Sequence, residues 1–291
     1  MGNRTDLAME ERELWQRNAK KTSKLHGVRA RERKGKGMTV TTVEILDERG
    51  ASALHKPVGT YVTLQWEKNL LRSPAGFRAA AERLGYLLSQ MVPEGDVLVV
   101  GLGNAAVTPD AVGPWALNHL MITRHLRQYY PSLRQVSAVA PGVLGTTGLE
   151  SVDVVRGLVE RTEPACVVVV DALASCTTER VCTTVQLTDT GIAPGSGVGN
   201  SRESFSKASL GIPVVAVGVP TVVEVSALLE QALLHFGVED ATCSRYCDPS
   251  MVVTPKDMDA RVASAARLLG YGISIGLHRG ISLEDVSCFV G

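Results

Sequence analysis

The chain has 291 residues, and 45% of them are hydrophobic, so it can bury the core of one large domain or two small ones. Its 30 basic and 30 acidic side chains balance, which excludes a general field that would draw nucleic acid or a membrane surface. No apolar run reaches the roughly 18 residues that cross a bilayer, and the polar N-terminus lacks the apolar core of a secretory signal. We expect a cytoplasmic protein with no direct nucleic-acid partner and no membrane partner.

The six cysteines form no CxxC pair, and a disulfide framework is not expected at this length in a reducing compartment. A nucleophilic cysteine would need a partner histidine, which the sequence cannot place. We therefore interpret the cysteines as ordinary buried or surface thiols.

The N-terminal third begins with a charged, helix-compatible stretch. A basic, glycine-containing stretch, Arg29–Gly37, follows and is interpreted as the end of a mobile segment. Strands are predicted at Thr39–Leu46 and at Thr60–Trp66, where β-branched and aromatic residues gather. Ser73 is a typical N-cap, and Pro74 after it opens a helix that runs to Met91.

From residue 96 onward, short continuous apolar runs alternate with helical segments. The predicted strands are Val97–Val100, Val136–Val139, Cys166–Val170 and Val214–Val219. The predicted helices between and after them are Pro109–Tyr130, Leu149–Glu163 and Thr221–Phe236. This alternation predicts an α/β fold with a mostly parallel sheet flanked by helices on both faces.

Three further elements complete the prediction. Cys182–Thr188 alternates polar and apolar residues, so it is predicted as an edge strand or an antiparallel strand. Met251–Thr254 is the last predicted strand, and a C-terminal helix follows from Pro255 to about Leu277.

Two aspartates follow predicted strands at the sheet edge where α/β proteins bind ligands. Asp171 comes directly after Val167–Val170, and Asp110 follows Val97–Val100 through a glycine-containing loop. A carboxylate at the end of a buried strand is costly unless it is paired, bound to a metal or protonated, whereas Asp110 in a first helical turn also has a purely stabilising interpretation. If both loops converge, one carboxyl keeps a proton, and the pair could activate water against a peptide carbonyl.

The segment 189–200 is rich in glycine and could offer backbone N–H groups to a substrate. Its predicted supporting residues are Asp189, Gly195, Gly197 and Gly199. The alternative is an irregular connecting loop.

Two other kinds of site are considered. Gly101–Ala106 fits the dinucleotide fingerprint, but Pro109 delays the helix and the acidic residue expected after the next strand is missing. A metal site could combine Asp110 and Asp171 with His119 or His125, although single helical histidines are more often packing residues. We predict neither a cofactor nor a metal.

The motifs together resemble the germination protease family of spore-forming bacteria, between Arg4 and Lys256. The agreeing stretches are Val99–Asn104, Val107–Ala111, Leu120–Leu126, Ala140–Gly145, Asp171–Ala174, Glu179–Arg180, Asp189–Asn200 and Gly211–Thr221. The resemblance implies an atypical aspartic endopeptidase with Asp110 and Asp171 as its essential residues, and a fold similar to hydrogenase maturation proteases. It also implies a homotetrameric zymogen that degrades small acid-soluble spore proteins in the forespore and spore core.

The resemblance further implies cleavage after an acidic residue and before a large apolar residue followed by alanine. Because Asp6-Leu7-Ala8 has that pattern, we predict self-cleavage between Asp6 and Leu7. Residues 1–6 would then be a propeptide and residues 7–291 a single α/β peptidase domain. A cationic pocket for the acidic residue would use Arg180 or Arg202.

The chain departs from longer family members in its short segment between Phe236 and Met251, where those members carry an extended insertion. Two other functions stay open: a metal-dependent peptidase of the hydrogenase-maturation type, and a non-catalytic peptide-binding protein.

Overall fold

The computed structural model describes residues 5–18, 25–195, 202–236, 238, 247–248 and 251–290. The strands are β1 (Val28–Gly35), β2 (Met38–Ile45), β3 (Gly59–Trp66), β4 (Val97–Gly101), β5 (Val136–Val139), β6 (Cys166–Ser175), β7 (Thr184–Thr188), β8 (Val214–Glu224) and β9 (Val252–Val253). The α-helices are α1 (Ala8–Asn18), α2 (Glu48–Leu54), α3 (Pro74–Ser89), α4 (Val112–Leu117), α5 (Leu144–Thr147), α6 (Ser151–Thr162), α7 (Lys207–Leu210), α8 (Val225–His235), α9 (Met258–Leu277) and α10 (Leu283–Val290). Short 3-10 helices are η1 (Leu70–Arg72), η2 (Thr108–Asp110), η3 (Arg124–Leu126) and η4 (Thr178–Arg180).

The described strands form one sheet in the order β1-β2-β3-β7-β8-β6-β4-β5, with β9 paired to β8. The half containing β8, β6, β4 and β5 is parallel. The other half contains β1, β2, β3 and β7 and is antiparallel. The two halves meet where β7 pairs with β8.

The α/β class is confirmed, but the prediction of a mostly parallel sheet needs correction, because the sheet is mixed. The connection from β6 to β7 spans only residues 176–183. A parallel crossover needs about a dozen residues or more, so β7 returns antiparallel. It lies inside the sheet between β3 and β8, and not at an edge.

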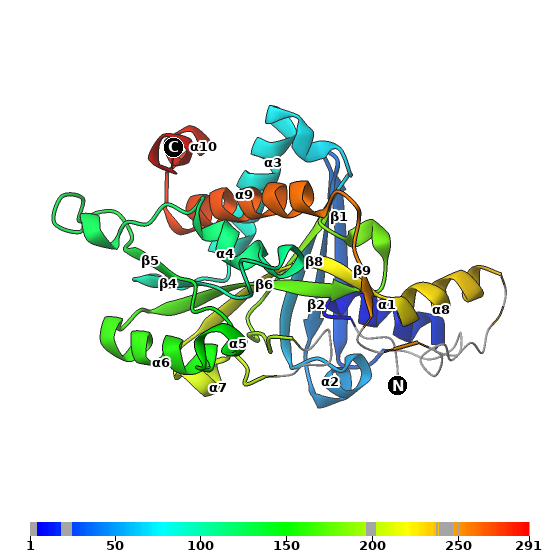
Figure 1. Ribbon diagram of the computed structural model, residues 1–291. Coiled ribbons are helices and arrows are strands. Elements are labelled where there is room, and N and C mark those ends of the chain that lie inside the picture. Colours follow the sequence, from blue (N-terminus) through cyan, green and yellow to red (C-terminus); the bar gives the residue numbers. More distant parts are fainter. Residues whose placement is uncertain are drawn as a thin grey trace.

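Helices cover both faces of the parallel half (Figure 1). α3, α4 and α9 lie on one face and enclose the largest apolar cluster, while α6 and α7 lie on the other face. A third cluster joins α1 and α2 to β2 and β3 at the antiparallel half. The N-terminal residues that the structure describes therefore belong to the same packed body as the sheet.

Two predicted segments differ from the structure. Arg29–Gly37, predicted as mobile, contains most of β1, a charged strand at the edge of the sheet, where charges prevent pairing with other chains. The single helix predicted at Pro109–Tyr130 is divided into η2, α4 and η3. The helical path is not continuous because Thr123 is tied to the start of β5. Its backbone N–H donates to the Val136 carbonyl oxygen, and its hydroxyl donates to the Arg134 carbonyl oxygen and accepts the Val136 N–H.

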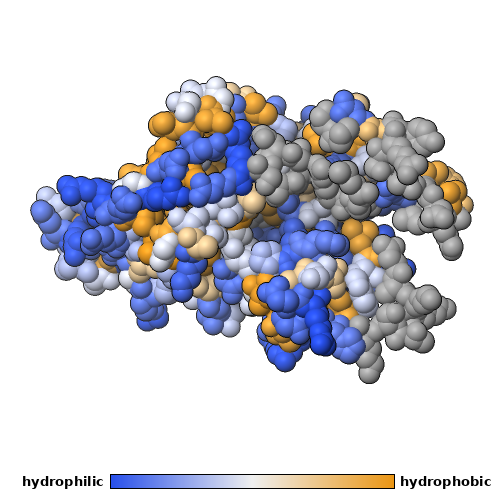
Figure 2. Space-filling model, turned by 90° about the horizontal axis from the view of Figure 1, so that it is seen from below, coloured by the Kyte–Doolittle hydropathy of each residue, from blue (hydrophilic) through white to orange (hydrophobic). Residues whose placement is uncertain are grey.

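No helix in the described part of the chain is long and apolar enough to cross a membrane. Hydrophilic residues make up most of the coloured surface seen from below, with apolar residues between them in small groups (Figure 2). This face of the molecule is therefore of mixed polarity.

Candidate active site

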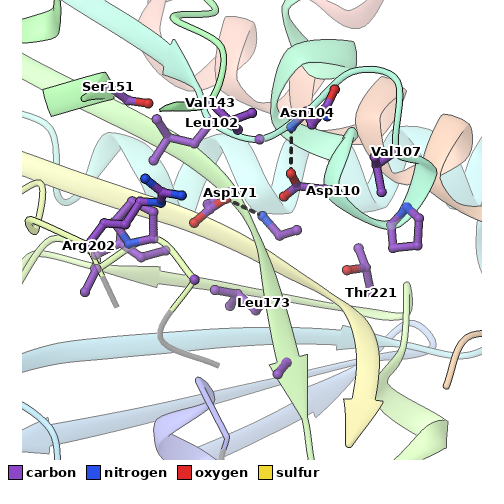
Figure 3. Close-up of a pocket in the computed structure, with 18 of the residues that line it drawn as sticks. Leu102, Asn104, Val107, Asp110, Val143, Ser151, Asp171, Leu173, Arg202 and Thr221 are labelled. Carbon is purple, nitrogen blue, oxygen red and sulfur yellow. Dashed lines mark hydrogen bonds between the residues drawn. The ribbon is translucent and has the colours of Figure 1, made fainter. Parts of the chain in front are cut away.

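A cavity of about 450 Å³ lies where β4 ends beside β6 (Figure 3). Its walls come from the loop between β4 and α4, from β6 beyond Val170, from residues 143–145 and 192–195, and from β8. The aspartates predicted from the sequence, Asp110 and Asp171, both line it.

Asp171 lies within β6, and not after it as predicted, because β6 continues to Ser175 alongside β8. The last pair between β4 and β6 joins Gly101 to Val170, so Asp171 is the first residue of β6 with an open edge on that side. The residue is only 5% exposed, and its carboxyl accepts a hydrogen bond from the Ala172 N–H at 2.9 Å. Burial raises the pKa of Asp171 well above its usual value, and the negative charge of Asp110 raises it further.

Asp110 is held in η2 by the loop that leaves β4. Its Oδ2 accepts a hydrogen bond from the Asn104 N–H at 2.7 Å, while burial raises its pKa against the effect of this bond. Gly103, with a φ of +111°, lets the loop turn back closely, since a Cβ there would lie 1.9 Å from the Asp110 carbonyl oxygen. The Leu102 N–H donates to Val170 O at 2.8 Å, which fixes the loop next to Asp171.

Thr221 is a further lining residue that the sequence reasoning did not single out. The pairing of β6 with β8 shifts after Leu173, so Leu173 faces Pro220 and Ala174 faces Val222. Thr221 is the extra residue of this bulge, and it lines the cavity (Figure 3). Pro220 within an apolar run was the available signal, because proline inside a sheet marks an edge or a bulge.

The germination protease family model matches residues 4–246. The chain belongs to the germination protease family. A germination protease from Caldanaerobacter subterraneus subsp. tengcongensis is 39% identical and covers 99% of this chain and 98% of its own length. One from Clostridium perfringens strain 13 is 37% identical with the same coverage, and one from Bacillus cytotoxicus is 43% identical over 81% of this chain and 68% of its own length.

Membership in the germination protease family makes the chain a peptidase. Among solved structures, a NiFe hydrogenase maturation protease, HycI from Thermococcus kodakarensis KOD1, is similar with a TM-score of 0.35. The two chains are 14% identical, and the match covers 64% of this chain and 98% of the other.

Asp6 also lines the cavity. Its backbone N–H donates to Ala174 O at 3.1 Å, and its Oδ2 accepts from the Ala174 N–H at 2.8 Å. The charge of Asp6 contributes to the raised pKa of Asp171, after burial and Asp110. Leu7 is fully buried in the cluster of α1, α2 and β2. Asp6, on one side of the predicted cut, thus lies at the cavity with the two aspartates, whereas Leu7, on the other side, packs in the core.

The two candidate arginines occupy different places. Arg202 lines the cavity, with Nη1 3.5 Å from Glu150 Oε1. Arg180 is outside the lining; its guanidinium lies 2.8 Å from Glu10 and 2.8 Å from Glu13 and holds α1. The geometry therefore gives Arg180 a structural contact and leaves Arg202 as the candidate for binding an acidic substrate side chain.

The predicted supporting residues are also divided. Gly195 lines the cavity, but Gly197 and Gly199 lie outside the described residues. Asp189 is not a lining residue; its Oδ1 accepts the Thr60 N–H at 2.8 Å and ties β3 to the end of β7.

Neither histidine considered for a metal site lines the cavity. His119 packs 6.4 Å from the Tyr271 ring, and burial, followed by the charge of Arg267, lowers its pKa. His125 is exposed in η3. In the described ranges, no group of three or more His, Cys, Asp or Glu side chains is placed to hold a metal ion.

Proposed function

We propose that this protein is an aspartic endopeptidase, made as a zymogen, that cuts itself between Asp6 and Leu7. Its substrates would be the small acid-soluble proteins of the spore, degraded at germination, and its working form a homotetramer. The observation that carries the proposal is the pair of carboxyls in one cavity, the buried Asp171 and the half-buried Asp110, each with a raised pKa.

The different environments of the two carboxyls would give one the role of acid and the other the role of base. Asp171 is nearly enclosed and lies beside a second carboxyl, so it keeps a proton and acts as the acid. Asp110 accepts the Asn104 N–H, which favours its ionised form, so it acts as the base. Two interacting carboxyls share their titration, so the assignment describes the dominant form of the pair.

In the first step, water adds its oxygen to the peptide carbonyl carbon and gives a proton to Asp110. Asp171 gives its proton to the carbonyl oxygen, which yields a neutral gem-diol. The C–N bond then breaks, the leaving nitrogen takes the proton from Asp110, and one hydroxyl of the gem-diol returns a proton to Asp171. The enzyme regains its starting form.

Two features support the predicted substrate preference. Arg202 places a cation at the cavity, where an acidic substrate residue could be paired. The chain's own acidic residue, Asp6, already lies there, followed by a large apolar residue and alanine. Relatives bearing the name germination protease support action in spores.

The test is the intact mass of the purified protein over time at mildly acidic pH. We expect wild type to lose residues 1–6, while the variants Asp110→Asn and Asp171→Asn keep them. Equal shortening of all three would contradict the proposal, because a contaminant would then be responsible. If wild type stays intact, a form beginning at Leu7 is tested on a spore protein, and its inactivity would refute the aspartic mechanism.

A chelator arm separates the metal-dependent alternative. The aspartate pair predicts equal rates with and without the chelator, whereas a metallopeptidase would lose activity and regain it with a divalent ion. Peptide binding without any cleavage would favour the non-catalytic alternative.

A further inference from the structure

Gln186 is a buried polar side chain in the interior strand β7, where all five residues are buried. The nitrogen and the oxygen of its side-chain amide each form a hydrogen bond with the main chain of the N-terminal segment. Nε2 donates to the Asp6 carbonyl oxygen at 2.9 Å, and Oε1 accepts the Ala8 N–H at 2.8 Å. Gln186 therefore holds the backbone on both sides of Leu7.

The hydrogen bond from Gln186 to the Asp6 carbonyl oxygen bears on the chemistry of the proposed cut. This carbonyl is the acyl half of the Asp6–Leu7 peptide bond, which is the bond of the proposed self-cleavage. A fixed N–H donor on a carbonyl oxygen polarises the carbonyl and stabilises the negative charge that grows there during attack by water. The Gln186 amide is neutral and buried, so it provides such a donor with little reorganisation.

The sheet register places Gln186 in line with the proposed acid. Gln186 pairs with Gly218 on one side of β8, and Asp171 pairs with Gly218 on the other. Directly paired residues of neighbouring strands project from the same face of a sheet, so the two side chains share a face. Gly218 between them has no side chain, and the neighbouring Leu173 fills the space above it.

The three residues around the bond have separate, specific environments. The Asp6 carboxylate accepts the Ala174 N–H, Leu7 is fully buried beside Leu173, and Ala8 is also fully buried. The segment is thus fixed in register as well as in position.

We infer that Gln186 is a further residue of the self-cleavage site, where it holds the Asp6 carbonyl and donates to its oxygen as the bond is cut. The inference rests on the proposed self-cleavage and extends it. A purely structural role, in which Gln186 only anchors the N-terminal segment, is the alternative that the experiment must separate.

The experiment follows self-cleavage by intact mass, across pH, in wild type, Gln186→Glu and Gln186→Met. The Met side chain keeps the volume but cannot donate, so cleavage should slow by about 100-fold at every pH, as for a lost oxyanion donor. The Glu side chain donates only when protonated. Cleavage by Gln186→Glu should therefore approach the wild-type rate at low pH and fall relative to it as pH rises.

The matched control is Gln65→Glu in the neighbouring strand β3, where Gln65 pairs with Thr184 while Thr63 pairs with Gln186. It should cleave at the wild-type rate. Thermal unfolding of each variant checks that the fold is kept. If the Glu variant unfolds, the cleavage rate of the Met variant tests the inference.

The outcomes are distinct. If wild type cleaves itself and Gln186→Met matches its rate, only this inference is overturned. A rate ratio of Gln186→Glu to wild type that stays constant with pH also overturns it, since a mere anchor would not respond to protonation. If wild type never shortens, the self-cleavage itself fails, and the role of Gln186 fails with it.

Discussion

Two acidic side chains are buried near the same end of β6, and their surroundings differ in the partners that they offer. Glu10 is 1% exposed and receives hydrogen bonds from Arg180, Ser175 and the Cys176 N–H. Asp171 is 5% exposed, forms no ion pair among the described residues, and faces a second carboxyl. A buried acid that serves the fold is fully paired, whereas one left beside another acid is destabilising and needs a functional reason.

The largest expected effect is on catalysis. Asp171→Asn and Asp110→Asn should each lower peptidase activity by about 1,000-fold or more, because each removes one of two proton-transfer groups. The measurement is the initial rate on a peptide with an acidic residue before the cut. Loss of activity in only one variant would break the idea of a working pair.

The opposite effect is expected at the paired acid. Glu10→Gln should lower the free energy of unfolding by about 3 kcal/mol, because among the described residues it leaves the largely enclosed Arg180 guanidinium with Glu13 alone as an acidic partner. Urea unfolding in the Asp171→Asn background measures this without self-cleavage. The control Glu284→Gln removes an exposed pair with Arg78 and should leave the urea midpoint unchanged; a similar loss in both would erase the contrast.

The pH dependence of stability sharpens the comparison between Asp171 and Glu10. The folded state raises the pKa of Asp171, so between the unfolded and folded pKa values it binds more protons than the unfolded chain. Stability contributed by this group is therefore lost as pH rises. The melting temperature of Asp171→Asn should exceed that of wild type at neutral pH, and the difference should shrink below about pH 4. A difference independent of pH would mean that the carboxyl is not protonated in the fold.

The smallest effect concerns specificity. Arg202→Ala should reduce the preference for Glu over Gln before the cut by about tenfold, since one charge-assisted hydrogen bond is lost. Arg156→Ala, which removes a surface arginine paired with Asp153 and Glu203, is the matched control. An equal loss on Glu and Gln peptides would show that Arg202 does not bind the acidic side chain.

The sequence was most informative where strands are buried on both faces. β4 and β6 contain continuous apolar runs that leave few other interpretations, and the aspartates near their ends were found from that pattern. Asp171 was placed after the strand because its polarity interrupts the run, although the pairing with β8 continues to Ser175. Only the spatial neighbours show that the strand goes on.

Long-range partners account for most of what the sequence could not show. Gln186 has no distinguishing local pattern, and its partners Asp6 and Ala8 are 180 and 178 residues away. β1 was missed because its alternation is hidden by charged residues suited to an edge strand. The contacts of Arg180 with α1 likewise depend on the fold, so nearness to the motif in sequence suggested a substrate role for a residue that the structure places outside the cavity lining.

The bond between Asp6 and Ala174 spans 168 residues, and the bulge at Thr221 lies farther along the chain. During synthesis the ribosome must therefore release β8 before the cavity can close around Asp171. A nascent chain that ends before Thr221 has both aspartates but lacks one wall of the cavity. The order of translation thus delays the peptidase site until most of the polypeptide has left the exit tunnel.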